Sequence, residues 1–225
     1  MPKRALIERR PWLLASLIAG ISFYFVKDAA LAGLFKMAWK GGGVALLAVY
    51  ALRHAPGRDG KLLAAVMAFG AAGDMAIEIS LEAGAACFFV GHVIAIALYA
   101  RHRRAVLTPS QKATAVTLLL GTPLIAFLLP TDRSAAPGVA LYALALGGMA
   151  AAAWSSAFPR YRVGVGAVMF VASDLLIFSR MGPLAGSPLP DLLIWPLYYA
   201  GQFLICVGVV RHLRAACRNT PMGIM

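Results

Sequence analysis

Charged side chains are scarce in this sequence, and acidic ones most of all. Only 13 % of the 225 residues are charged, and the nine acidic residues stand against 21 lysines and arginines. Hydrophobic residues make up 61 %, far above the proportion in a soluble globular domain. The composition excludes a soluble enzyme. We predict a single integral membrane domain over residues 1–225, a multi-pass protein of the lipid bilayer, with a bacterial inner membrane as the expected location.

Cysteine and histidine are also rare. The three cysteines are odd in number and form no CxxC pair, so we expect neither a disulfide framework nor thiol chemistry. A zinc hydrolase needs about three His, Cys or carboxylate ligands, but only His92 of the four histidines lies deep in an apolar segment. The glycine triplet 41–43 lies within an apolar segment and indicates close helix contact or a local bend. We therefore predict no metal and no cofactor.

Polar and turn-forming residues divide the apolar sequence into eight segments. At about 20 apolar residues per transmembrane helix, the chain length suits seven or eight spans. The breaks contain proline, glycine and charge, which are typical of loops. We predict an all-α membrane protein, a bundle of about eight transmembrane helices at residues 11–26, 33–52, 61–80, 84–101, 113–129, 137–157, 163–180 and 191–211.

Lysine and arginine are distributed unequally between the two ends of these segments. Because short cytoplasmic loops are enriched in both residues, their positions predict the orientation of the chain. Most lie at the termini or in the even-numbered connections, whereas only Lys27, Arg133 and Arg180 fall in the opposite connections. We therefore predict that both termini are cytoplasmic. This asymmetry accounts for most of the net charge of +12, so a nucleic-acid partner is not expected.

The first apolar segment also resembles a secretory signal peptide. It follows a basic stretch, and the Ala-Leu-Ala at residues 30–32 has the form of a signal-peptidase site. We favour a retained first helix, because seven more segments follow and the count of eight then agrees with the charge distribution.

A few polar side chains lie inside the predicted helices, where an ionisable group costs about 3 kcal/mol on insertion scales. A rise of about 1.5 Å per residue places Asp74 and Asp174 about 18 Å from the cytoplasmic ends of their helices, level with Lys40, His92 and Gln202. Polar residues from five helices at one depth predict a functional site. The full set of candidate site residues is Lys36, Lys40, Asp74, Glu78, His92, Ser173, Asp174, Tyr198, Tyr199 and Gln202.

Spacing helps to order these candidates. Asp74 and Glu78 are four residues apart and share a helix face, but Glu78 lies nearer the outer interface and ranks lower. Ser173 is adjacent to Asp174, and adjacent residues on a helix point about 100° apart. We therefore interpret Ser173 as a small packing residue rather than a nucleophile.

Two stretches suggest an internal duplication. AVMAFGAAGD ends at Asp74 and AVMFVASD ends at Asp174, and four helices separate them. A parallel four-plus-four repeat would place the two carboxylates around a pseudo-twofold axis, facing each other. Two carboxyl groups in one low-dielectric site can act as general acid and general base. Such a pair suits acid-catalysed hydrolysis through an oxocarbenium-like cation.

Several motifs together resemble the YhhN-like family of lysoplasmalogenases. They are KGGGVALL from Lys40, GAAGD ending at Asp74, FFVGH ending at His92, GAVMFVASDLLIF around Asp174 and YYAGQFLI from Tyr198. The resemblance runs in order from about residue 36 to 206. It implies eight membrane helices and hydrolysis of the vinyl ether bond of a lysophospholipid substrate, the lysoplasmalogen. The products would be a fatty aldehyde and glycerophospho-ethanolamine or glycerophospho-choline, and no cofactor is implied.

The resemblance also implies roles for individual residues. Asp74 and Asp174 match the family's two membrane aspartates and would be the catalytic pair, with Asp174 favoured as the acid. The family commonly has Lys-Pro where this sequence has Lys40 followed by glycine, and Lys36 competes for the match. The substrate-binding residues would be Lys40, His92, Tyr198 and Gln202.

Three other readings of the same residues remain open. The carboxylates could form a proton relay or cation site in a transporter or binding protein for an amphiphile. A metal-dependent lysophospholipid ester or amide hydrolase would need a zinc site. A bundle without catalysis could be stabilised by an ion pair between Lys40 and Asp74 or Asp174. The sequence leaves the oligomeric state open.

Overall fold

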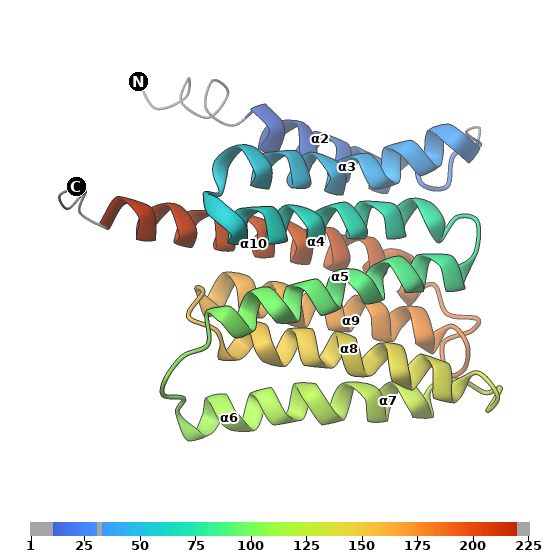
Figure 1. Cartoon of the computed structure of the whole chain (residues 1–225). Helices are drawn as coiled ribbons and strands as arrows, with labels where there is room; N and C mark the ends of the chain where they lie inside the picture. Colours follow the sequence, from blue (N-terminus) through green and yellow to red (C-terminus); the bar gives the residue numbers. More distant parts are fainter. Residues whose placement is uncertain (1–10, 31–32, 220–225) are drawn as a thin grey trace.

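The computed structural model describes residues 11–30 and 33–219, and over these ranges the chain forms eight helices and no strand (Figure 1). The fifth helix consists of α6, the wide π-turn η1 and α7, and the seventh consists of η2 and α9. The N-terminal basic stretch and residues 31–32 of the signal-peptidase motif lie outside the described residues. The elements are α2 (Pro11–Val26), α3 (Gly33–His54), α4 (Gly57–Ala76), α5 (Leu81–Arg101), α6 (Pro109–Val116), η1 (Thr117–Gly121), α7 (Thr122–Leu128), α8 (Ala136–Ser155), η2 (Arg160–Gly164), α9 (Val165–Ser179) and α10 (Leu189–Asn219).

Five of these helices are long and apolar enough to cross a membrane. They are α5, the continuous helix Pro109–Leu128, α8, the continuous helix Arg160–Ser179, and α10 over Leu189–Arg218. The described part of α2 is apolar but has only 16 residues. Helices α3 and α4 are of similar length but are not among these five. The predicted all-α membrane protein is thus confirmed as an all-helical chain with five candidate membrane-spanning helices.

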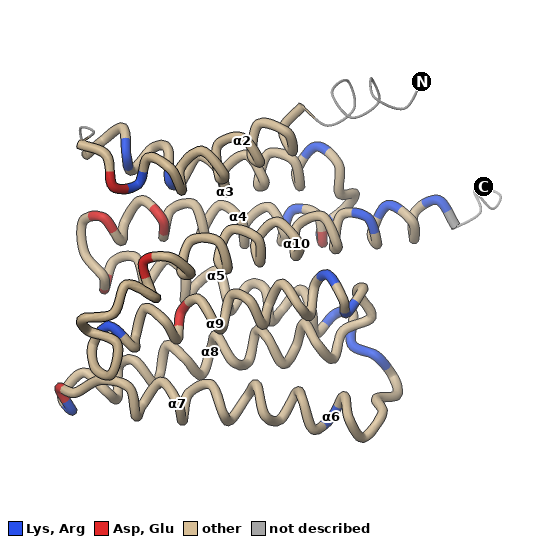
Figure 2. Tube along the Cα trace, turned by 180° about the vertical axis from the view of Figure 1, so that it is seen from behind, with Lys and Arg blue, Asp and Glu red and all other residues tan. Residues whose placement is uncertain are grey.

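The helices lie side by side, and the chain repeatedly crosses between two ends of the bundle (Figure 1). We call the end where α2 begins and α10 ends the basic end; it also holds connections 54–57, 101–109 and 155–160. The opposite end, the acidic end, holds connections 26–33, 76–81, 128–136 and 179–189. Lysine and arginine gather toward the basic end, and acidic residues lie mainly toward the acidic end (Figure 2).

Three helices begin earlier than hydropathy predicts, and two of them begin at a side-chain cap. Helix α4 begins at Gly57, whose positive φ of 67° suits glycine, rather than at 61. The Ser80 side chain accepts a hydrogen bond from the Ala83 N–H, so α5 begins at Leu81 rather than 84. Thr108 and Gln111 form a reciprocal capping box, so α6 begins at Pro109 rather than 113. Helix α10 continues to Asn219, beyond the predicted end at 211, because its charged last turns contain no helix-breaking residue.

The glycine triplet of α3 provides close contact with both neighbouring helices. A Cβ on Gly43 would lie 3.3 Å from the Cα of Gly20 in α2, and one on Gly41 would lie 2.7 Å from Cγ of Met75 and 2.9 Å from the backbone oxygen of Ala71. Helix α3 runs unbroken through all three glycines. The predicted close helix contact is confirmed.

The last helix returns to pack against the first three described helices as well as against its neighbour α9. Trp195 donates a hydrogen bond to the backbone oxygen of Gly20 in α2 at 2.8 Å. The Tyr199 hydroxyl lies 2.8 Å from Oγ of Ser16, also in α2. These contacts fix the rotation of α10, so that Tyr198, one position from Tyr199, faces α4.

Candidate functional site

Asp74 of α4 is buried and hydrogen-bonded to a tyrosine of α10. The Tyr198 hydroxyl donates to Oδ2 of Asp74 at 2.8 Å, and Nε2 of Gln202 donates to the Tyr198 oxygen at 3.4 Å. Tyr198 and Gln202 are one helical turn apart and therefore share a face. We call Asp74, Tyr198 and Gln202 the Asp74 cluster; it joins two of the sequence's substrate-binding candidates to a catalytic candidate.

The glycines of the GAAGD motif make room for this cluster. A Cβ on Gly70 would lie 2.8 Å from Nε2 of Gln202, and one on Gly73 would lie 2.8 Å from the ring of Phe88. Both separations are below normal van der Waals contact, so a side chain at either position would displace its neighbour. The motif therefore serves to bring the Asp74 backbone close to α10 and α5.

Asp174 of α9 has a corresponding arrangement. The Tyr142 hydroxyl of α8 donates to Oδ2 of Asp174 at 2.7 Å, and Nε2 of His92 lies 3.2 Å from the same hydroxyl. Because the hydroxyl proton goes to the carboxyl group, Nε2 of His92 must be the donor in the second contact. We call Asp174, Tyr142 and His92 the Asp174 cluster.

Tyr142 is a site residue that the sequence analysis missed. Tyr142 sits in the alanine- and leucine-rich stretch LYALALGG, with no charged or amide side chain near it in the sequence. A tyrosine hydroxyl buried in an apolar helix nearly always requires a hydrogen-bonding partner. That requirement is the signal that could have identified it.

Aromatic rings occupy the space between the two clusters. The Phe170 ring contacts Tyr198 of the Asp74 cluster, with centroids 5.1 Å apart, and His92 of the Asp174 cluster at 5.0 Å. Phe88 contacts both Phe170 and Tyr198 at 6.0 and 5.7 Å. Within the described part of the chain, no hydrogen bond joins the two carboxyl groups. The aspartates are linked through aromatic packing rather than by a shared proton.

The two clusters agree only in part with the hypothesis of a four-plus-four repeat. A four-plus-four repeat relates the third helix to the seventh and the fourth to the eighth. Asp74 and Asp174 lie on the third and seventh helices, and Gln202 and His92 lie on the eighth and fourth, as this relation requires. Tyr198 and Tyr142 lie on the eighth and sixth helices, which the repeat does not relate to each other. The repeat therefore stays a prediction.

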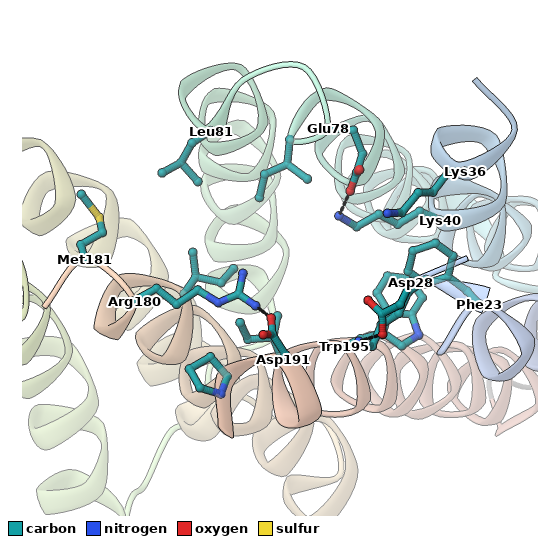
Figure 3. Close-up of a pocket in the computed structure, with 15 residues that line it drawn as sticks. Phe23, Asp28, Lys36, Lys40, Glu78, Leu81, Arg180, Met181, Asp191 and Trp195 are labelled. Carbon is teal, nitrogen blue, oxygen red and sulfur yellow. Dashed lines mark hydrogen bonds and ion pairs between the residues drawn. The ribbon is translucent and has the colours of Figure 1, made fainter. Parts of the chain in front are cut away.

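A pocket of about 460 Å³ lies at the acidic end, beside both clusters. Lys40 forms an ion pair with Glu78 at 2.6 Å on one side, and Arg180 pairs with Asp191 on the other (Figure 3). Lys40 thus pairs with Glu78 and not with either aspartate, unlike the ion pair considered for a non-catalytic bundle. Four cations and three carboxylates line the pocket. Lys27, Lys40 and Arg180 pair with Asp28, Glu78 and Asp191, so among the described residues Lys36 is the pocket cation without an ion pair.

A much smaller cavity of about 20 Å³ lies against Asp174. Its walls also include Tyr142 and Phe88. It is large enough for one water molecule, since such a site needs at least about 10–15 Å³ and a few polar partners. The wall residues Ile77, Leu81 and Ile177 line both this cavity and the larger pocket. Asp174 therefore lies next to the charged pocket, behind one layer of apolar side chains.

The remaining candidates have partners outside the clusters. Oγ of Ser173 donates to the backbone oxygen of Ile194 at 3.0 Å, which agrees with its interpretation as a packing residue. Tyr199 contacts Ser16 of α2, and Lys36 lines the pocket beside Lys40. No group of three or more His, Cys, Asp or Glu among residues 11–30 and 33–219 is placed to hold a metal ion.

Fold and site together define a class: an all-helical protein with candidate membrane spans, two buried aspartate–tyrosine clusters and a pocket lined by charged side chains at one end. The sequence profile of the YhhN family matches residues 35–209, and the chain belongs to this family. It is similar to proteins named lysoplasmalogenase from Mycobacterium bovis and Mycobacterium tuberculosis. Each is 28 % identical over 186 residues, which cover 78 % of this chain and 70 % of the relative. No solved structure matches the chain.

Proposed function

We propose that this protein is a membrane hydrolase that cleaves the vinyl ether bond of lysoplasmalogens, using Asp174 and Asp74. The observation that carries the proposal is the position of the Asp174 cluster. Its carboxyl group faces a water-sized cavity, and that cavity shares a wall with a pocket lined by four cations and three carboxylates. The names of the two mycobacterial relatives support the substrate class.

All eight helices cross the membrane in this proposal, as one domain with both termini in the cytoplasm. The concentration of lysine and arginine at the basic end supports that orientation. The acidic end then faces outward, and the pocket lies at the level of the outer head groups.

Along the membrane normal, the pocket, the apolar wall and Asp174 follow one another in the same order as the phosphate, the glycerol and the vinyl ether of the substrate. The phosphate of the lysophospholipid binds near Lys36 and Lys40, because ammonium groups are effective phosphate ligands. The glycerol and the vinyl ether extend past Ile77, Leu81 and Ile177 toward Asp174. The hydrocarbon chain continues toward the middle of the bilayer.

Catalysis begins with proton transfer from Asp174 to the second carbon of the alkenyl chain. The Tyr142 hydroxyl donates to Oδ2, which leaves Oδ1 to carry this proton. The double bond is consumed, and an oxocarbenium ion forms at the first carbon. Water adds to that carbon and gives its proton to the Asp174 carboxylate. The hemiacetal then collapses: the bond to the glycerol oxygen breaks, that oxygen takes the proton from Asp174, the hemiacetal hydroxyl gives its proton back to the Asp174 carboxylate, and the aldehyde is released.

Asp74 and Phe88 stabilise the cation in this scheme. Asp74 contributes a negative charge across the aromatic layer, and Tyr198 orients its carboxyl group. The Phe88 ring lines the Asp174 cavity, where the face of an aromatic ring attracts a positive charge.

The proposal is tested by supplying purified protein with an alkenyl lysophospholipid and, separately, with its 1-acyl counterpart. We expect aldehyde from the alkenyl substrate, and no fatty acid from the acyl one. In D₂O the aldehyde should carry one deuterium at its second carbon. A stable, monodisperse preparation that releases no aldehyde would favour transport or lipid binding instead. Zinc at unit stoichiometry would contradict the cofactor-free mechanism.

A further inference from the structure

An arginine and a tryptophan at the basic end have buried polar atoms without partners. In the described part of the chain, Nε and Nη2 of Arg160 and Nε1 of Trp154 donate no hydrogen bond. Buried donors left unpaired cost about 1–3 kcal/mol each. Nε and Nη2 form one edge of the guanidinium group, whose parallel N–H bonds match two oxygens of a phosphate.

The two side chains form one unit. The Arg160 guanidinium lies over the Trp154 ring, with Cζ 5.7 Å from the centroid. Gly164 allows this packing, because a Cβ there would lie 2.9 Å from the indole and 3.2 Å from Cγ of Arg160. The unpaired donors are therefore held in place by the local packing.

An apolar groove of about 560 Å³ begins at the same tryptophan. Trp154 lines it, and α9 contributes Val165 to Ala172, a length of about 10 Å along the helix. Helix α6 and the wide turn η1 form the opposite wall, through residues such as Thr114. The groove thus runs from Trp154, which packs against Arg160, toward the middle of the predicted bilayer.

The charges nearby favour an anionic ligand. Arg162 lies two residues from Arg160, and Lys112 directly precedes the groove residue Ala113. The nearest acidic residue at this end, Asp59, is already bound by Arg101 and His102. No described carboxylate is placed to attract the ammonium group of a zwitterionic lipid here.

We propose that Arg160, Trp154 and this groove form a binding site for one anionic phospholipid of the inner leaflet. The phosphate receives the hydrogen bonds of the guanidinium edge and of the indole, and one acyl chain lies along α9. The site is separate from the proposed catalytic pocket, which lies at the acidic end, and does not depend on the proposed activity.

The test uses the full chain in phosphatidylcholine nanodiscs containing a small fraction of lipid with brominated acyl chains, which quench nearby tryptophan fluorescence. The difference between the wild type and Trp154→Phe isolates the signal of Trp154. We expect brominated phosphatidylglycerol to quench Trp154 at about tenfold lower mole fraction than brominated phosphatidylcholine, as one charge-assisted contact predicts.

Arg160→Gln should abolish this preference. Arg58→Gln, which removes the same charge from an exposed position in the first turn of α4 at the same end, should keep it. Should Arg160→Gln fail to fold, Ala172→Phe fills the groove and should reduce quenching by either lipid. Inorganic phosphate should not displace the lipid. Equal quenching by the two lipids, an unchanged preference in Arg160→Gln, or displacement by phosphate would each overturn the proposal.

Discussion

Replacing Tyr142 by phenylalanine removes one hydroxyl group from the centre of the Asp174 cluster. The ring is retained, so its edge-to-face packing with His92 and Phe178 should persist. Two hydrogen bonds are lost: the one donated to Asp174 and the one accepted from His92. The variant therefore tests whether the orientation of the Asp174 carboxyl group matters for turnover.

The expected loss follows from the strength of these contacts. A hydrogen bond to a charged or ionisable partner contributes about 1.5–3 kcal/mol, which corresponds to about 10- to 150-fold in kcat. KM should change by less than about threefold, because Tyr142 lines the small cavity and not the pocket for the phosphate. The unpaired His92 should also lower the melting temperature by about 2–10 °C.

The assay is the initial rate of aldehyde release over a range of alkenyl lysophospholipid concentrations. Tyr161→Phe is the matched control, since Tyr161 is exposed at the basic end. Full kcat in Tyr142→Phe, or a loss confined to KM, would refute the reasoning.

Two further substitutions test the other parts of the site. Gly70→Ala should displace the Gln202 amide, which a new Cβ would approach to 2.8 Å, and lower kcat about tenfold, whereas Gly42→Ala, with open space around it, should slightly raise the melting temperature. Unchanged kcat in Gly70→Ala would argue against a role for this amide. Lys40→Met should raise KM for the lysophospholipid about tenfold, but not KM for an uncharged alkenylglycerol. An equal rise for both would indicate that loss of the Glu78 ion pair, rather than of a phosphate contact, explains the effect.

Hydropathy was sufficient to locate the eight helices but not their ends. The first predicted segment ends at 26, as α2 does, because the charged residues Lys27 and Asp28 follow the apolar run there. Helix α6 begins four residues before the prediction, since a Thr108–Gln111 capping box is polar and lies outside an apolar run. Cap signals are local hydrogen-bonding patterns, so they must be sought separately from membrane segments.

The site was predictable only as a set of polar residues at one depth. The pairing of Gln202 with Tyr198 follows from helical spacing, and the structure confirms it. The pairing of Asp174 with Tyr142 joins helices that are not related by any spacing in the sequence, so tertiary packing alone brings them together. The sequence could not predict the ion-pair partner of Lys40 for the same reason, because Lys40 and Glu78 lie on different helices.

The measurement that tests the central claim most directly compares aldehyde release by Asp174→Asn and Asp132→Asn. Both changes replace a carboxyl group by an amide of the same shape. Asp132 lies in the loop between α7 and α8, where hydrogen bonds from the backbone and hydroxyl of Ser134 lower its pKa, so it is an ionised carboxylate, and it lines neither the pocket nor the Asp174 cavity. We expect Asp132→Asn to release aldehyde at the wild-type rate and folded Asp174→Asn to release none. Wild-type turnover in folded Asp174→Asn would contradict the account.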